Sequence, residues 1–138
     1  MSNAIPFSLS NPAGLYDPAP NGYSHLAIVN PGSRMLLVAS QGGENAAGEL
    51  ADGFEAQVRQ ALANLRTTLA AGGADLVHVA KLTVLIVDHR EARLQAFGAL
   101  LSAAWGALPT PTCTLIPVPR LALDGMLFEI EATAFLPA

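Results

Sequence analysis

The sequence predicts an α+β fold in which a mixed β-sheet carries two helices packed on one face, in the order β-β-α-β-α-β-β. Two stretches, Leu50 to Ala71 and Arg90 to Trp105, repeat apolar residues at helical spacing. Three further runs, Leu76–Val87, Thr112–Val118 and Leu127–Phe135, have the composition of strands. Because both helices are amphipathic and need the same sheet to cover them, helices gathered on one side of that sheet are expected. At 138 residues we expect one domain, residues 1–138.

The N-terminal segment, residues 1–22, is expected to be an extended arm with turns rather than a helix, because it is rich in proline and asparagine. Two short β-rich runs follow, His25–Asn30 and Arg34–Ser40, on either side of Pro31-Gly32. Proline presets one φ angle of a turn and glycine tolerates a positive one. The sequence therefore predicts a hairpin between these runs.

The helix expected from Leu50 to Ala71 is the clearest element, and Gly72-Gly73 ends it. We interpret Arg59 and Arg66 as charges on its solvated face. Its apolar stripe consists of Phe54, Val58, Ala61, Leu62, Leu65 and Leu69.

The strand expected at Leu76–Val87 has one apolar face and carries Lys81 on the other. Burial would lower the pKa of a lysine there and suit it to Schiff-base or general-base chemistry. We favour the alternative, a lysine that meets polar cross-strand partners. Gly106 and Pro109 stop the second helix. The apolar positions are Ala80, Leu82, Val84 and Ile86 in the strand, and Leu94, Phe97, Leu101 and Ala104 in the helix.

The last strand alternates Glu129, Glu131 and Thr133 with apolar residues, so one face should be buried and the other wet or functional. A merely solvated strand face is the alternative interpretation of the two glutamates.

Composition excludes several classes of function. Apolar residues make up 51% of the chain and charged residues 13%, which favours a large subunit interface. The net charge is -4 and the chain has only seven Lys and Arg residues, so its composition does not favour binding to the phosphate backbone of a nucleic acid. One cysteine and three separated histidines support neither a disulfide framework nor a metal site, and we expect no cofactor.

A membrane span is not expected, although residues 94–119 contain no charged side chain. Four prolines, at positions 109, 111, 117 and 119, make a continuous helix there untenable. No charged segment precedes an apolar run at the N-terminus, so no secretory signal is evident. We expect a soluble cytoplasmic protein.

The C-terminal third resembles the signature of the RidA/YjgF family, also labelled endoribonuclease L-PSP, whose members deaminate reactive imine and enamine intermediates. The family typically reads R-[ST]-x-[VLI]-x-V-x-x-L and then [VIF]-E-[IV]-E-A. This chain has CTLIPVPRL from Cys113 and FEIEA from Phe128. The resemblance implies a fold related to that of chorismate mutase and a homotrimer with ligand clefts between subunits.

The resemblance also implies roles for residues of this chain. Glu129 matches the water-positioning catalytic glutamate, and Cys113 stands where the family has its substrate-binding arginine. The position next to it, Thr114, matches the family's Ser or Thr, and Arg120 matches an arginine that many members share. Two further substrate-binding positions are Tyr23, before the first strand of the hairpin, and Ser40, where the family has glycine in Ser-Gly-Gln.

Because a thiol is a weak single donor, Cys113 cannot form the bidentate pair with a substrate carboxylate that the arginine makes. We expect the Cys113 side chain to face the cleft beside Glu129 rather than the core under the helices. A buried, inert thiol is the competing interpretation.

Three functions stay open at this point. The first is a divergent imine or enamine hydrolase whose substrate lacks an α-carboxylate. The second is a trimer that binds a small metabolite in its clefts without turnover. The third is ribonuclease activity or translation inhibition, with which some relatives are labelled. The net negative charge of the chain argues against binding of RNA.

Overall fold

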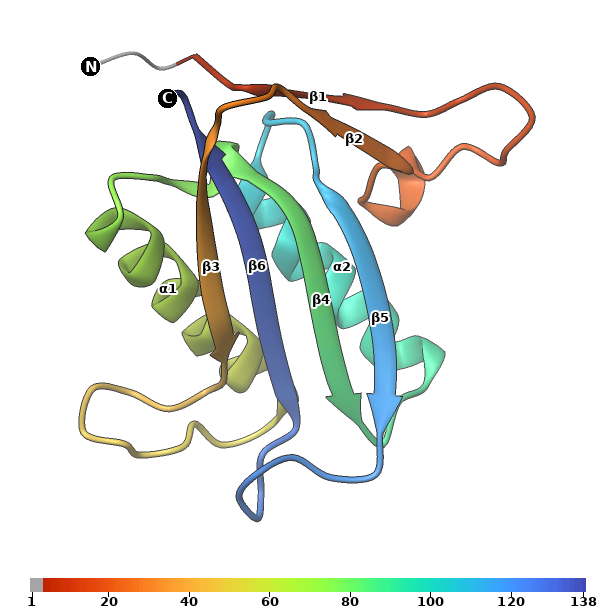
Figure 1. The fold of residues 1–138 in the computed structure, drawn as a ribbon. Helices are drawn as coiled ribbons and strands as arrows, with labels where there is room; N and C mark the ends of the chain where they lie inside the picture. The colour runs from red at the N-terminus through yellow and green to blue at the C-terminus, as the bar shows by residue number, and fades with distance from the viewer. Residues whose placement is uncertain (1–3) are drawn as a thin grey trace.

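Four strands form the main sheet of the protein, in the spatial order β3-β6-β4-β5 (Figure 1). The computed structural model describes residues 4–138. β6 runs antiparallel to both of its neighbours and β4 runs parallel to β5, so the sheet is mixed as predicted. The strands are β3 (Arg34–Gln41), β4 (Val79–Val87), β5 (Thr112–Val118) and β6 (Phe128–Leu136).

Two helices, α1 (Phe54–Ala71) and α2 (Glu91–Trp105), cover one face of this sheet (Figure 1). The predicted α+β arrangement is confirmed. We call the other side of the sheet the open face. The core lies between helices and sheet, where Leu65, Leu82 and Ile130 are fully buried.

Helix α1 begins at Phe54, four residues later than predicted. Gly53 precedes it with a φ of 89°, a conformation that glycine tolerates and other residues rarely adopt. The preceding residues instead form a loop, in which Glu44 and Leu50 make an isolated antiparallel bridge. The strand expected at Leu76 likewise starts later, because a short 3-10 turn, η2 (Leu76–His78), precedes β4.

The hairpin predicted between His25–Asn30 and Arg34–Ser40 is wrong. The turn is present, but β2 (Leu26–Val29) pairs with β1 (Phe7–Ser10) in a separate two-stranded sheet, and β3 pairs with β6. The N-terminal arm therefore contains a strand that the sequence analysis did not identify. Apolar packing holds this strand on the domain: the Phe7 ring in β1 contacts the Phe135 ring edge to face, with 6.4 Å between the ring centroids.

A short 3-10 turn, η1 (Ala19–Asn21), brings the arm back toward α2. Ser24 then fixes it to the start of β5: its N–H donates to the Pro111 carbonyl (3.1 Å) and its hydroxyl donates to the Thr110 carbonyl (2.7 Å). Ser24 is buried, so both bonds are shielded from water. The residues around η1 are thereby held against the domain.

No helix in the described part of the chain is long and apolar enough to cross a membrane.

Candidate functional site

A cleft lies between the N-terminal arm, helix α2 and strand β5. We call it the arm cleft; its volume is about 300 Å³. The arm contributes one wall and the apolar side of α2 contributes the other. Cys113 and Leu115 of β5 line it as well. The remaining lining residues are Tyr16, Asn21, Gly22, Tyr23, Leu94, Phe97 and Leu101.

Three aromatic rings stabilise the arm side of this cleft. Tyr16, Tyr23 and His25 contact one another edge to face, with centroid separations of 5.1 to 6.5 Å. The ring Nε2 of His25 lies 2.9 Å from the Tyr16 carbonyl oxygen, and the His25 N–H donates to Asn11 Oδ1 at 2.9 Å. Tyr23, singled out by the sequence analysis, is therefore held in place at the cleft.

Cys113 lies on the helix side of the sheet. It pairs with Leu82 of β4, whose side chain is fully buried in the core, and neighbouring residues across a ladder point to the same face. The thiol packs partly against this core and partly lines the arm cleft. Burial raises the pKa of the Cys113 thiol to about 11, so at neutral pH it is protonated and uncharged.

Glu129 lies on the open face, opposite Leu85. Burial raises the pKa of its carboxyl, and the nearby Glu44 carboxylate raises it further. The expectation that Cys113 lies beside Glu129 is wrong within one chain. Leu82 pairs with Cys113 and Leu85 pairs with Glu129. Because Leu82 and Leu85 are three residues apart in one strand, Cys113 and Glu129 point to opposite sides of the sheet.

The other residues proposed from the sequence are scattered. Thr114 is exposed on the open face, opposite Thr83. Arg120 lies in the loop after β5 and forms an exposed ion pair with Asp124 at 2.9 Å. Ser40 lies on the main sheet's edge strand, in a groove between the end of β3 and helix α1. Of these predicted residues, Tyr23 and Cys113 line the same cleft.

Glu44, which follows two glycines, was not among the residues predicted from the sequence. Asn64 of α1 orders this loop, because its amide donates to the carbonyl oxygens of Gly42 and Glu44 at 3.0 and 2.8 Å. A side chain at Gly43 would collide with Gln57, at 2.6 to 2.7 Å, so that glycine is required by close approach. The sequence signal for an ordered loop at Glu44 was the pair Gly42-Gly43, together with the amide side chains Gln57 and Asn64 in the helix that follows.

Gln57 was also missed, because a polar residue within an amphipathic helix gives no sign that it is buried. Its amide nitrogen donates to the carbonyls of Ala51 and Gly125, and its oxygen accepts from the Leu127 N–H, at 2.8 to 3.1 Å. One side chain thus joins α1 to the loop before α1 and to the loop that leads into β6. The backbone next to Glu129 is positioned in this way.

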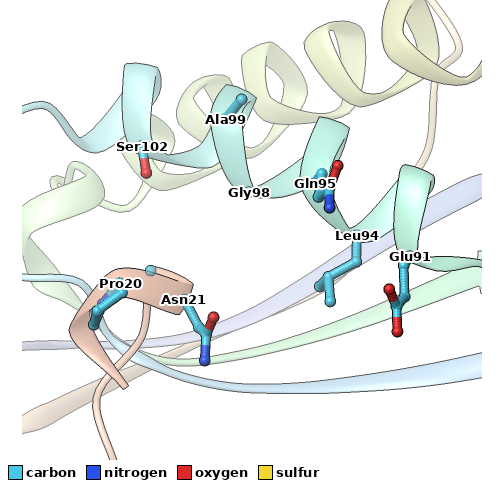
Figure 2. A pocket seen from close by; sticks show the side chains of 9 residues that line it. Pro20, Asn21, Glu91, Leu94, Gln95, Gly98, Ala99 and Ser102 are labelled. Atoms are coloured by element: carbon cyan, nitrogen blue, oxygen red, sulfur yellow. The ribbon is translucent and has the colours of Figure 1, made fainter. Parts of the chain in front are cut away.

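A second groove, which we call the outer groove, continues from the arm cleft along α2. It has a volume of about 480 Å³, and Asn21, Gly22 and Leu94 line both spaces. Figure 2 shows Ser102 of α2 pointing toward the turn that carries Pro20 and Asn21, and Leu94 and Glu91 further along the same side of the helix.

The open face exposes large apolar side chains. Leu37 and Met35 of β3 are 78% and 57% exposed, and Ile116 of β5 is 43% exposed. Within residues 4–138, no group of three His, Cys, Asp or Glu side chains is placed to hold a metal ion.

Comparison with known proteins gives a consistent family match. The sequence model of the family described as Endoribonuclease L-PSP matches residues 16–136. No match was found among curated proteins.

Several solved structures are similar to this chain. The conserved Rid family protein YyfB from Yersinia pestis, itself of unknown function, is 37% identical with a TM-score of 0.90, over 96% of this chain and 100% of that one. A member of the YjgF/YER057c/UK114 family from Mycobacterium tuberculosis is 26% identical with a TM-score of 0.64, over 94% and 99%. RidA from an Antarctic Psychrobacter shares the fold, at 23% identity and a TM-score of 0.69, over 93% and 94%.

Proposed function

Since this chain belongs to the Endoribonuclease L-PSP family, the family of the YjgF and RidA proteins, we propose that it hydrolyses reactive imines or enamines to carbonyl compounds and ammonia. We propose further that it works as a homotrimer, with each site completed by a neighbouring subunit. The reaction is the one that the family resemblance implied, carried out by a site in which Cys113 replaces the arginine.

One observation carries the proposal of a shared site. Tyr23 and Cys113 line the arm cleft on the helix side, whereas Glu129 lies on the open face of the same sheet. A site that uses all three must take Glu129 from a second chain. The exposed Leu37, Met35 and Ile116 support such an association, because an apolar surface of this kind is characteristic of subunit interfaces.

Glu129 would supply the proton transfers of the reaction. Its raised pKa makes the carboxylate a better base for water, and the acid so formed can return the proton. The carboxylate takes a proton from water as the oxygen attacks the imine carbon, and the C=N π electrons move to nitrogen, which is protonated. Glu129 then takes the hydroxyl proton of the resulting carbinolamine and delivers it to the amino nitrogen. The C–N bond breaks, neutral ammonia leaves, and the carbonyl forms.

Cys113 determines which substrates the site can hold. A protonated thiol offers a single weak donor, so it cannot bind a carboxylate as a guanidinium does. We therefore assign to this protein imines and enamines that lack an α-carboxylate.

The test is ammonia release from imines generated in place, for example by an amine oxidase acting on a primary amine, measured against the uncatalysed decay. The wild-type protein should accelerate the decay. Glu129→Gln, which keeps the size of the side chain but cannot cycle a proton, should return the rate to that of the uncatalysed reaction. An unchanged rate in Glu129→Gln would remove the assigned role of this residue.

A second candidate function is binding without turnover, in the same clefts. It is favoured by the uncharged lining of the arm cleft, which offers no ionised group to polarise a substrate. Saturable ligand binding with no acceleration of imine decay would establish it. Ribonuclease activity is disfavoured by the net charge of -4 and would require affinity for RNA at low salt.

A further inference from the structure

The arm cleft is uncharged. None of the described residues that line it is acidic or basic, and Cys113 keeps its proton at neutral pH because burial raises its pKa to about 11. Phe97, Leu101 and Leu115 supply apolar surface, and the phenol groups of Tyr16 and Tyr23 add polarity without charge. A carboxylate bound here would lose its hydration and gain no cation in return.

The outer groove also disfavours an anion. Among its described lining residues Glu91 is the one charged group, and it is acidic. A carboxylate that reached from the arm cleft into this groove would meet a like charge instead of a partner.

The shape of the arm cleft is set before a ligand arrives. The aromatic contacts of Tyr16, Tyr23 and His25 hold the arm together, and Ser24 ties it to the start of β5. A preorganised cavity binds an apolar group without the cost of ordering its own walls. A cavity of about 150 Å³ holds benzene in another protein, so one of about 300 Å³ has room for a ring and a short chain.

We infer that the arm cleft binds the uncharged apolar part of a small carbonyl-type ligand, about the size of one aromatic ring with a short chain, and rejects the same ligand bearing a carboxylate. This inference rests on the proposed function only in assigning the bound group to the substrate or product of imine hydrolysis. The selectivity itself is a property of the cleft and requires no turnover.

The experiment uses two ketones that share a benzyl group, phenylacetone and phenylpyruvate. They differ in that the second carries a carboxylate where the first carries a methyl group. Calorimetric titration of the wild-type protein at neutral pH should give a dissociation constant on the order of millimolar or tighter for phenylacetone. Phenylpyruvate should bind at least about ten-fold more weakly, because its charge is desolvated without a partner.

Three variants locate the binding. Leu94→Trp places a larger side chain at the junction of the arm cleft and the outer groove, and should weaken phenylacetone binding about ten-fold or more. Leu94→Arg adds a cation at the same position and should reverse the preference toward phenylpyruvate. Leu94 is 43% exposed, so both variants should fold. Leu123→Arg adds the same charge on an exposed loop side chain outside the cleft and should leave the wild-type preference unchanged.

The inference is overturned by equal or tighter binding of phenylpyruvate to the wild-type protein, or by the absence of saturable binding of both ketones. Binding of phenylacetone that Leu94→Trp does not weaken would place the ligand elsewhere and overturn it as well. If phenylacetone binds selectively while no imine decays faster, the inference stands and the proposed hydrolase function fails.

Discussion

Gln57 gives the sharpest test of how the loops near the candidate catalytic glutamate are held. Its side chain is 2% exposed and makes three hydrogen bonds to backbone groups of Ala51, Gly125 and Leu127. Gln57→Leu keeps a side chain of similar volume but removes all three partners. The buried position would then contain backbone polar groups without their hydrogen bonds.

The size of the effect follows from which groups can find water. Gly125 is exposed and its carbonyl can be rehydrated, whereas Ala51 and Leu127 are half-buried. An unsatisfied buried donor or acceptor costs about 1–3 kcal/mol. Allowing for the apolar gain of leucine, we expect Gln57→Leu to lower the free energy of unfolding by about 2–4 kcal/mol.

The assay is urea denaturation at fixed protein concentration, followed by circular dichroism. Gln95→Leu, the same substitution at an exposed position of α2, is the matched control and should change stability by less than about 0.5 kcal/mol. Hydrogen exchange should also become faster at the Leu127 amide. A loss for Gln57→Leu no larger than that of the control would refute the assigned role of this residue.

Three other predictions concern the subunit interface, the thiol and helix α2. The wild-type protein should elute with three times the chain mass of 14.3 kDa in light scattering coupled to size exclusion, and Leu37→Glu should shift it to monomers; a trimer that persists in the variant would place the interface elsewhere. Because the folded-state pKa of Cys113 is raised from 9.0 to about 11, stability should be full below pH 9 and fall as pH rises to 11, by about 2 kcal/mol more in the wild type than in Cys113→Ala. Equal alkaline losses in the two proteins would contradict the buried thiol. Finally, a Cβ on Gly98 would meet no atom within 4 Å, so Gly98→Ala should stabilise the protein by about 0.5–1 kcal/mol in the same urea assay, and a destabilised variant would mean that the helix surface is in contact there.

Much of the fold could be predicted because local periodicity specified it. Thr112–Val118 was predicted with the bounds that it has as β5, and the alternation of Phe128, Ile130 and Ala132 with Glu129 correctly separated the two faces of β6. These features depend on which face of one element meets the core. Such information lies within the element itself.

The failures concern partners rather than elements. Pro31-Gly32 does form a turn, but whether β2 then pairs with β3 or with β1 depends on Phe7 packing against Phe135, far apart in the chain. No local pattern contains that contact.

The candidate site was hard to predict for the same reason. Cys113 and Glu129 lie on different strands, and the relation between their faces is set by how each pairs with β4. That the two side chains lie on opposite faces of the sheet follows only from the residue-by-residue pairing of β5 and β6 with β4. Glu44 and Gln57 act through loop geometry and burial, which the sequence does not reveal.

The proposed site for imine hydrolysis takes its arm cleft from one chain and Glu129 from the next. Whether two chains share each site can be tested with mixed trimers, made by co-expressing Glu129→Gln chains with Leu94→Trp chains. In a trimer of Glu129→Gln chains every site has an altered glutamate, and in a trimer of Leu94→Trp chains every site has an altered cleft. In a random mixture, about one quarter of the shared sites would combine an intact cleft with an intact glutamate.

The measurement is ammonia release from an amine-derived imine by the two pure variants and by the mixed trimers. We expect no acceleration by pure Glu129→Gln, at most about one tenth of the wild-type acceleration by pure Leu94→Trp, and about one quarter of it by the mixture. A mixture as inactive as its components, from a wild-type protein that is active, would show that each site belongs to a single chain and would contradict the account.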